Sequence, residues 1–519
     1  MSEKVLEKKI KWHVDHFLTI KDLVKWGASA HSIELSTESL EKVEKARSIF
    51  LEALHSGRWI YGSSSGFGPL AGQKIDRSEG AMHQQHLLYH LATGVGEHLS
   101  SVQSRTMCVL RLFQLSRGYA GISYTTLSQL LNLYSLNVTP VVPSLGSVGA
   151  SGDLTPLAHA ALAISGEYKV AYKGGVWEGS SWFEQMTVAP VRWKEGEALA
   201  YVNGTACMAA LAAISCFQAQ KVWEQSLLHT FIMGETQAAF QEAWNPLLGE
   251  AKPHPGQQRV LSFLTYWGKG SDWLSGSPTD HLQEIPRIPQ DPYTIRCAPQ
   301  LLGAVSDQLA YVEEVVTREI NSASGNPTIF TETEEIIHGG NFNGQSLAFA
   351  ADTLTQALVY MGVYAERRIA RMTDPHLNLG LPAYMVRGKL GFQSGLMGAQ
   401  VTASALVAQL RSLATPLAIQ SIPTNNNNQD IVSMGTLAAW RSHQCVELLM
   451  QILAIEAILL AEAVEIRQKQ FALKSFAQIT CDWKEKLRKK CPAILTDRPL
   501  SDEIQVIAQE IAKGLLLPS

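Results

Sequence analysis

The 519-residue sequence lacks a surplus of charge of either sign, and this argues against two classes of partner. Lys and Arg number 43 and Asp and Glu 47, which gives a formal net charge of −4. Proteins that bind nucleic acid or an anionic membrane usually carry a basic surface, and this balance predicts none. Charged residues are only 17% of the chain and hydrophobic residues 46%, a composition that leaves room for extensive buried interfaces.

Paired cysteines are lacking too. The seven cysteines are scattered, odd in number and never arranged as C-x-x-C, so neither a disulfide framework nor a zinc site is predicted. The first nine residues mix charges without an apolar run, which is not the pattern of a signal peptide. A reducing, cytoplasmic location is therefore expected.

Helical periodicity is what the sequence has in abundance. Apolar residues predict four long helices at roughly 300–321, 344–372, 394–413 and 433–472. The last is free of Gly and Pro from Thr436 to Ala472 but is interrupted by Glu456, Glu462 and Glu465. These carboxylates favour a helix buried among other helices over a membrane span.

These patterns predict a mainly α fold whose core is a long antiparallel helical bundle. An N-terminal domain is expected over residues 1–215, and the long-helix bundle with a C-terminal helical region over 216–519. Between Gly- and Pro-containing turns, residues 166–192 predict a small β excursion.

A glycine-rich stretch, Gly149-Ala150-Ser151-Gly152-Asp153-Leu154, admits two interpretations. One is a tight turn before a helix, with Asp153 or Thr155 as its cap. The other is chemical, because in a sharply bent loop the Gly152 nitrogen can attack the Ala150 carbonyl carbon. Loss of two waters, one taking the Ser151 hydroxyl, then leaves a methylidene-imidazolone ring. The stretch alone favours the turn.

Two further stretches carry candidate functional side chains. Tyr61 lies in a loop rich in Gly and Ser, where it is either a surface aromatic or an acid/base group on a lid. His83, His86 and His90 share one face of a predicted helix. That run has no H-E-x-x-H motif and no acidic residue, so a partly buried polar helix is favoured over a metal site.

Several short motifs then occur in a fixed order: Ala-Ser-Gly-Asp-Leu at 150–154, Asn-Gly-Thr at 203–205, Gln-Asp-x-Tyr-x-x-Arg-Cys at 290–297, Gly-Gly-Asn-Phe at 339–342 and Asn-Gln-Asp at 428–430. Together they resemble the aromatic amino-acid ammonia-lyase and aminomutase family, from about Tyr61 to about Thr436. The combination is specific, since several unrelated matches in one order are very improbable by chance.

The resemblance implies a cofactor and a set of roles. The cofactor is 4-methylideneimidazole-5-one, formed autocatalytically from Ala150-Ser151-Gly152, and no metal is implied. Tyr61 is the implied general base on the lid, and Arg296 grips the substrate carboxylate. Asn203 and Tyr293 lie beside the ring. The remaining lining of the ring and the substrate site is implied for Leu154, Gln290, Asn326 and Phe342.

The resemblance also bears on the substrate. At the two positions facing the substrate's aromatic end, this chain has His90-Leu91, similar to tyrosine-accepting bacterial members. Histidine-specific members have Ser-His there, and phenylalanine-specific plant members have Phe-Leu. Histidine-specific members also carry a glutamate where this chain has Gln429, so Asn428-Gln429 supplies no charge for an imidazole.

The sequence therefore predicts a tyrosine ammonia-lyase that yields p-coumarate and ammonia. A tyrosine 2,3-aminomutase and a phenylalanine or histidine ammonia-lyase stay open, as does a non-enzymatic helical oligomer whose loop never cyclises. The resemblance further implies a homotetramer with active sites shared between subunits. The expected partner is a small aromatic amino acid, with no nucleic acid and no membrane.

Overall fold

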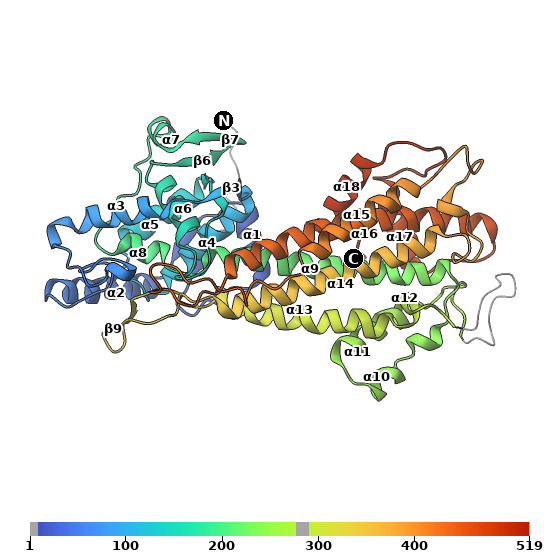
Figure 1. The fold of residues 1–519 in the computed structure, drawn as a ribbon, viewed down its shortest axis with the longest axis horizontal. Coiled ribbons are helices and arrows are strands. Elements are labelled where there is room, and N and C mark those ends of the chain that lie inside the picture. The colour runs from blue at the N-terminus through green and yellow to red at the C-terminus, as the bar shows by residue number, and fades with distance from the viewer. Residues whose placement is uncertain (1–8, 277–289, 518–519) are drawn as a thin grey trace. The chain divides into compact units, whose positions relative to one another are not determined.

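The computed structural model describes residues 9–276 and 290–517, and its fold is mainly α. Helices account for 58% of the described residues, and the sheets among them are few and small (Figure 1). This confirms the predicted fold class. The charged residues 1–8, on which the expectation about a signal peptide rests, lie outside the described residues.

The long helices of the predicted bundle are present, with their ends within a few residues of the expected positions. Another long helix follows the Asn-Gly-Thr motif. These helices are α9 (Ala206–Thr236), α13 (Ala298–Ile320), α14 (Gln345–Thr373), α15 (Met397–Ser412) and α16 (Gly435–Gln470).

The chain divides into two compact units. Unit 1 comprises Met1–Phe217, Glu313–Asp352 and Pro416–His443, and unit 2 comprises Gln218–Val312, Thr353–Thr415 and Gln444–Ser519. Four of the long helices, α9, α13, α14 and α16, contribute residues to both units. The domain boundary that the sequence predicts near residue 215 stays a prediction.

Unit 1 combines short helices with four small sheets. Its helices are α1 (Ile20–Ala28), α2 (Thr37–His55), α3 (Gly80–Leu91), α4 (Ser101–Ser116), α5 (Tyr124–Ser135), α6 (Leu154–Ile164), α7 (Gly179–Met186) and α8 (Glu197–Val202). Its strands are β1 (Ile10–Trp12), β2 (Ile33–Leu35), β3 (Val95–His98), β4 (Thr139–Pro140), β5 (Pro143–Leu145), β6 (Lys169–Tyr172), β7 (Gly175–Glu178), β8 (Thr328–Phe330) and β9 (Glu335–Ile337). The pairs are β1–β2, β3–β5 and β8–β9, and β4–β6–β7 form a three-stranded sheet.

The predicted β excursion at 166–192 is shorter than expected. It begins as the antiparallel hairpin of β6 and β7, but the chain then turns into α7 and continues without strand structure. Thr187 ends α7 in the left-handed region at φ +54°. Pro190 in the following segment has no N–H to donate to a strand partner.

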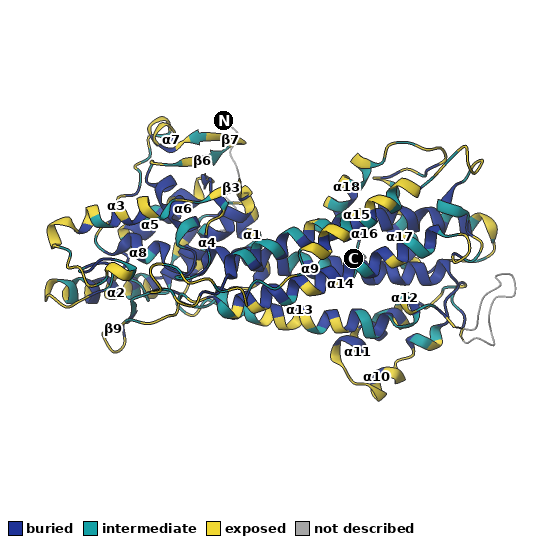
Figure 2. Ribbon diagram, in the orientation of Figure 1, coloured by how far each residue is buried: buried dark blue, intermediate teal, exposed yellow. Residues whose placement is uncertain are grey.

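Unit 2 contains the other parts of the long helices and packs them around buried charge. Its remaining helices are α10 (Leu247–Ala251), α11 (Pro255–Trp267), α12 (Tyr293–Arg296), α17 (Gln478–Arg488) and α18 (Ser501–Lys513), together with α15. Trp223 on α9 donates from its indole nitrogen to the Leu302 carbonyl on α13 at 2.8 Å. Figure 2 shows the inner faces of α9, α14 and α16 buried.

An ion pair joins three of these helices inside unit 2. Arg368 on α14 donates to the Glu456 carboxylate on α16 at 2.7 Å and to the Ser226 carbonyl on α9 at 3.2 Å. His229 Nδ1 donates to the same carboxylate at 2.9 Å. Both members of the pair are only 1% exposed, so each charge depends on its partner.

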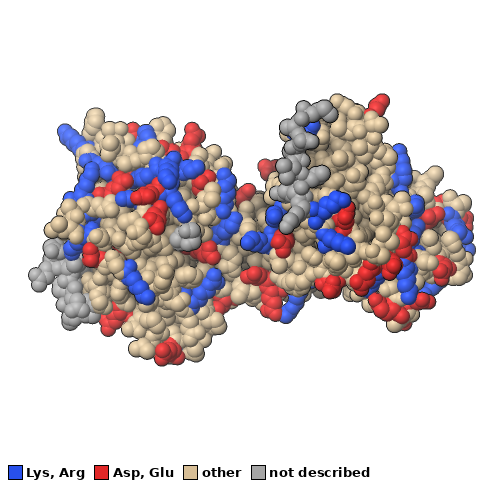
Figure 3. Space-filling model, turned by 180° about the vertical axis from the view of Figure 1, so that it is seen from behind, with Lys and Arg blue, Asp and Glu red and all other residues tan. Residues whose placement is uncertain are grey.

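Ion pairs nearer the surface also join chain segments within unit 2. Arg387 and Arg488 each bind both Glu462 and Glu465, with Arg488 Nε 2.7 Å from the Glu465 carboxylate. On the face of the molecule seen in Figure 3, basic and acidic side chains are interspersed.

Helix α16 is long and apolar enough to cross a membrane by length and composition alone. The other described helices do not meet both criteria. In its most apolar 18-residue window, 78% of the residues are buried inside the protein. Such burial is typical of the core helix of a helical bundle.

The buried ion pair yields a stability prediction. Arg368→Met leaves the Glu456 carboxylate buried without its guanidinium, so the free energy of unfolding should fall by about 3–5 kcal/mol. Chemical denaturation of the variant checks this. The matched control is Arg318→Met, because Arg318 pairs with Glu314 on the exposed surface and such pairs contribute little. Equal losses in both variants would contradict the assignment.

Candidate active site

The Ala150-Ser151-Gly152 stretch is a sharp bend between β5 and α6. Ala150 and Gly152 face each other across the bend as bridge partners, and Gly152 is bridged in turn to Gly204. Gly152 has φ +72°, and a Cβ there would lie 2.3 Å from the Gly204 carbonyl oxygen. Only glycine fits at this position, both for its backbone angle and for the space available.

Side chains from two distant segments bind the middle of the bend. Asn203 Nδ2 donates to the Ser151 carbonyl oxygen at 3.2 Å. Gln429 Nε2 donates to the Ser151 hydroxyl oxygen at 3.0 Å. Three predicted site residues, Ser151, Asn203 and Gln429, are thus in direct contact within unit 1.

Asp153 anchors the bend but caps a different helix from the one the sequence indicates. Its side chain makes no cap hydrogen bond with α6. Its carboxylate instead accepts from the N–H groups of Cys207 and Met208, at 2.8 and 2.9 Å, in the first turn of α9. It also accepts from the Thr436 hydroxyl at 2.6 Å. Complete burial, only partly offset by these donors, raises the pKa of Asp153 to about 6.

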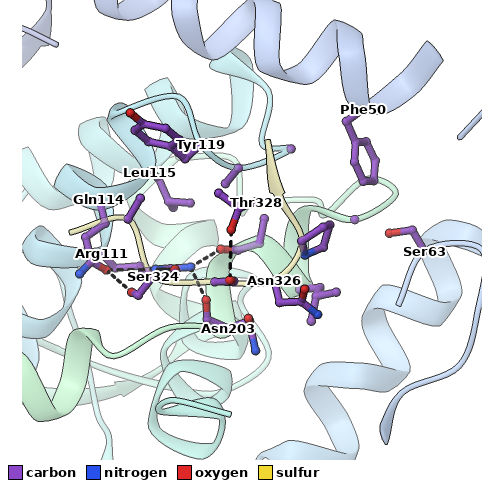
Figure 4. Close-up of a pocket in the computed structure, with 18 residues that line it drawn as sticks. Phe50, Ser63, Arg111, Gln114, Leu115, Tyr119, Asn203, Ser324, Asn326 and Thr328 are labelled. Atoms are coloured by element: carbon purple, nitrogen blue, oxygen red, sulfur yellow. Dashed lines mark hydrogen bonds between the residues drawn. The ribbon is translucent and has the colours of Figure 1, made fainter. Parts of the chain in front are cut away.

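Arg111 on α4 binds the backbone around Asn203 (Figure 4). Its guanidinium donates to the carbonyl oxygens of Tyr201 at 2.9 Å, Asn203 at 2.8 Å and Ser324 at 3.1 Å. Burial lowers the pKa of Arg111 to about 10. Sequence analysis missed this residue, because an arginine in a helical run gives no sign that it is buried.

Tyr61 is half-buried in the loop of residues 59–75, which we call the lid loop. Its N–H donates to His338 Nε2 at 3.2 Å, and its phenol oxygen accepts from the Gly68 N–H at 2.8 Å. Its ring meets the Phe67 ring edge-on, with centroids 6.3 Å apart. The predicted base therefore has defined contacts on both its backbone and its side chain.

Helix α3 presents His90 beside the same lid loop. The His90 and Phe67 ring centroids are 6.1 Å apart. His90 is exposed and its Nδ1 donates to the His86 carbonyl at 3.1 Å, while the adjacent Leu91 is half-buried. The His83 ring stacks on the Phe67 ring, with the ring centroids 4.4 Å apart. In residues 9–276 and 290–517, no group of three or more His, Cys, Asp or Glu side chains could hold a metal ion.

The asparagine run forms a tight loop whose ends pair at Thr424 and Gln429. Asn425, Asn426 and Asn427 all have positive φ, which asparagine tolerates better than most residues. Asn428 is exposed, and its Oδ1 lies 3.9 Å from where a Cβ on Gly68 would stand. The loop thus lies between the bend and the lid loop.

The other predicted residues of unit 1 lie at the ends of elements. Leu154 is the first residue of α6 and is half-buried. Asn326 Oδ1 accepts from the Gly339 N–H at 2.9 Å, next to the His338 that binds Tyr61. Phe342 is half-buried in the loop before α14.

Gln290, Tyr293 and Arg296 form a group of their own in unit 2. Tyr293 is 67% exposed, and the Arg296 guanidinium carbon lies 5.0 Å from the centre of its ring. Gln290 and Arg296 line a cavity of about 380 Å³. Within the described part of the chain, the buried Arg296 Nε has no hydrogen-bond partner.

The mainly α fold thus holds a sharp Ala-Ser-Gly bend in contact with Asn203 and Gln429. The family model for aromatic amino acid lyases matches residues 18–489, a longer range than the motifs span. The chain belongs to this family.

Relatives with different activities are similar to the chain by comparable amounts. A tyrosine ammonia-lyase from Cereibacter sphaeroides is 37% identical, over 88% of this chain and 89% of that protein. A probable histidine ammonia-lyase from Thermoplasma volcanium is 36% identical, over 96% and 98%. The solved structure of a tyrosine aminomutase from Streptomyces globisporus is 30% identical, with a TM-score of 0.91 over 98% of each chain.

The buried Asp153 carboxyl yields a pH prediction. Burial raises its pKa from 3.8 to about 6, so the native state holds the proton more tightly than the unfolded chain. The group therefore stabilises the fold most below about pH 4, and this contribution is lost as the pH rises through about 6. In Asp153→Asn the amide oxygen can accept from Cys207 and Met208, and the amide nitrogen can donate to Thr436.

The stability of Asp153→Asn relative to that of the wild type should therefore rise between about pH 4 and pH 8. Melting temperature against pH measures it. Asp430→Asn, at an exposed neighbouring position, is the control and should run parallel to the wild type. A parallel curve for Asp153→Asn would refute the assignment.

Proposed function

We propose that this chain is an L-tyrosine ammonia-lyase that forms p-coumarate and ammonia. The observation that carries the choice of tyrosine is the hydrogen bond of His90. A carbonyl oxygen can only accept, so the bond to the His86 carbonyl places the proton of the neutral ring on Nδ1. Nε2 is then an acceptor, and a tyrosine phenol is the substrate end that donates to it.

The amide contacts of Gln429 support the same choice. A histidine substrate favours a nearby carboxylate, whereas Gln429 carries a neutral amide that binds Ser151. The similarity to histidine ammonia-lyases is as large as that to the tyrosine enzyme. The proposal of tyrosine therefore rests on His90 and Gln429 and not on overall identity.

The bend fits a self-formed methylideneimidazolone. Ala150 and Gly152 are paired across it, and the missing Cβ of Gly152 lets the backbone approach Gly204. Asn203 would hold the group through the Ser151 carbonyl oxygen, which the ring keeps. The Ser151 hydroxyl that Gln429 contacts would leave as water when the ring forms. Such a ring supplies the electrophile that no ordinary side chain provides.

The chain's own residues would bind the substrate and move its proton. Tyr61 would take the β-proton on its phenol oxygen, which accepts a hydrogen bond from the Gly68 N–H. Arg296 would grip the substrate carboxylate in a bidentate fashion. The proposed lining of the amine and aromatic parts comprises His90, Leu91, Leu154, Gln290, Tyr293, Asn326, Phe342 and Asn428.

We further propose a homotetramer whose active sites combine residues from several subunits. The high exposure of Tyr293, at 67%, supports a site that other surfaces complete. A cytoplasmic location stays part of the proposal.

A second candidate function is tyrosine aminomutase activity. The TM-score of 0.91 to a solved tyrosine aminomutase favours it. The two activities differ in whether ammonia leaves or returns to the β-carbon, so the products separate them.

The substrate assay tests the proposed function. Incubation with tyrosine should give p-coumarate absorbance, and chromatography should show β-tyrosine as a minor product at most.

His90→Phe removes the acceptor for the phenol, so kcat/KM for tyrosine relative to phenylalanine should fall by about 10–100-fold. Activity on histidine alone would refute the choice of tyrosine, and unchanged mass without loss of two waters would refute ring formation.

The proposed roles of Tyr61 and Arg296 predict different kinetic defects. Tyr61→Phe lacks the proton acceptor, so kcat should fall by at least about 100-fold while tyrosine still binds. Arg296→Ala loses the carboxylate contact, so the binding of tyrosine should weaken by at least about tenfold. Calorimetric titration and steady-state kinetics separate the two effects. Near-normal turnover by Tyr61→Phe would disprove its role as the base.

A further inference from the structure

The lid loop is fastened to α3 by neighbouring side chains. His83 Nε2 donates to the Ser65 carbonyl oxygen at 3.2 Å. The His83 and Phe67 rings stack with centroids 4.4 Å apart and an interplanar angle of 12°. Both contacts join the lid loop only to α3. Gln84, also on α3, makes a third connection, which reaches α8 as well.

Gln84 is completely buried and uses both ends of its amide. Nε2 donates to the Gly62 carbonyl oxygen at 2.9 Å, and Oε1 accepts from the Leu199 N–H at 3.0 Å. Leu199 lies in the first turn of α8, which ends at Val202 immediately before Asn203. One side chain therefore joins the backbone beside Tyr61 to the helix that leads into Asn203.

Without Gln84, the Gly62 carbonyl oxygen and the Leu199 N–H would have little opportunity to form other hydrogen bonds. Gly62 has φ +68°, and a Cβ there would lie 2.5 Å from Leu199 Cδ2, so the loop already packs closely against α8. The Leu199 N–H is in the first turn of α8, where no intrahelical acceptor exists. Loss of the amide would leave a buried donor and a buried acceptor without this partner.

We propose that Gln84 is a positioning residue that latches the lid loop to α8 and so fixes Tyr61 relative to Asn203. The inference rests on the proposed lyase activity for its consequence. A firmly latched lid keeps ammonia beside the unsaturated acid, and a loose lid releases it. The strength of the latch thus sets how the product divides between p-coumarate and β-tyrosine.

Hydrogen–deuterium exchange of the ligand-free protein tests the latch directly. In Gln84→Met, exchange of peptides covering residues 59–75 should be roughly tenfold faster than in the wild type. Gln85→Met is the matched control, because its amide reaches the exposed Glu167 and not the lid loop. It should leave exchange of the lid loop unchanged.

A second variant guards against a folding defect. Gln84→Glu keeps the shape and an acceptor for the Leu199 N–H but sets an oxygen against the Gly62 carbonyl, so it should also speed exchange of the lid loop. With tyrosine as substrate, both variants should lower the ratio of β-tyrosine to p-coumarate. They should still show the loss of two waters in the intact mass.

The outcomes separate the latch from the proposed function. Wild-type exchange of the lid loop in both Gln84 variants overturns the latch, whatever the substrate. Faster exchange spread over all of unit 1 also overturns it, because that reports general destabilisation. Faster exchange confined to residues 59–75 without turnover of tyrosine by the wild type leaves the latch standing and refutes the tyrosine ammonia-lyase proposal.

Discussion

The close approach of Gly152 to the Gly204 carbonyl oxygen is the constraint on which the site depends. There is no space for a side chain at residue 152, and the next N–H, that of Asp153, donates to the same carbonyl at 2.7 Å. The bend and the Asn-Gly-Thr loop are therefore fixed to each other by their backbones. Asn203 can reach the Ser151 carbonyl only because the two loops are in contact.

Two buried charged residues hold these loops from behind. The Asp153 carboxylate joins the bend to the start of α9 and to Thr436. The Arg111 guanidinium joins the Asn203 loop to Ser324. Each group is costly to bury, as their shifted pKa values indicate, and the several hydrogen bonds to each offset part of that cost. These polar contacts therefore fix the geometry of the site more than they add to the stability of the fold.

Particular residues show what the sequence could predict. The long helices follow from apolar periodicity, and the Ala-Ser-Gly bend, Asn203 and Gln429 follow from short motifs whose members prove to be in contact. Arg111 and Gln84 could not be predicted, since each is a polar residue in a helical run and its burial depends on segments distant in sequence. The sequence also could not predict which helix Asp153 caps, because that helix, α9, begins more than fifty residues later.

Overall identity does not distinguish the activities named for the relatives of this chain. The chain is 30–37% identical to proteins named as a tyrosine lyase, a probable histidine lyase and a tyrosine aminomutase, so overall similarity does not separate these reactions. A tenfold change in rate corresponds to only about 1.4 kcal/mol, which is the scale of one or two hydrogen bonds. Under the proposed function, one acceptor nitrogen on His90 would therefore be enough to alter the choice of substrate. In the proposed latch, one amide between the lid loop and α8 would likewise be enough to alter how long ammonia stays, and neither change would need a different fold.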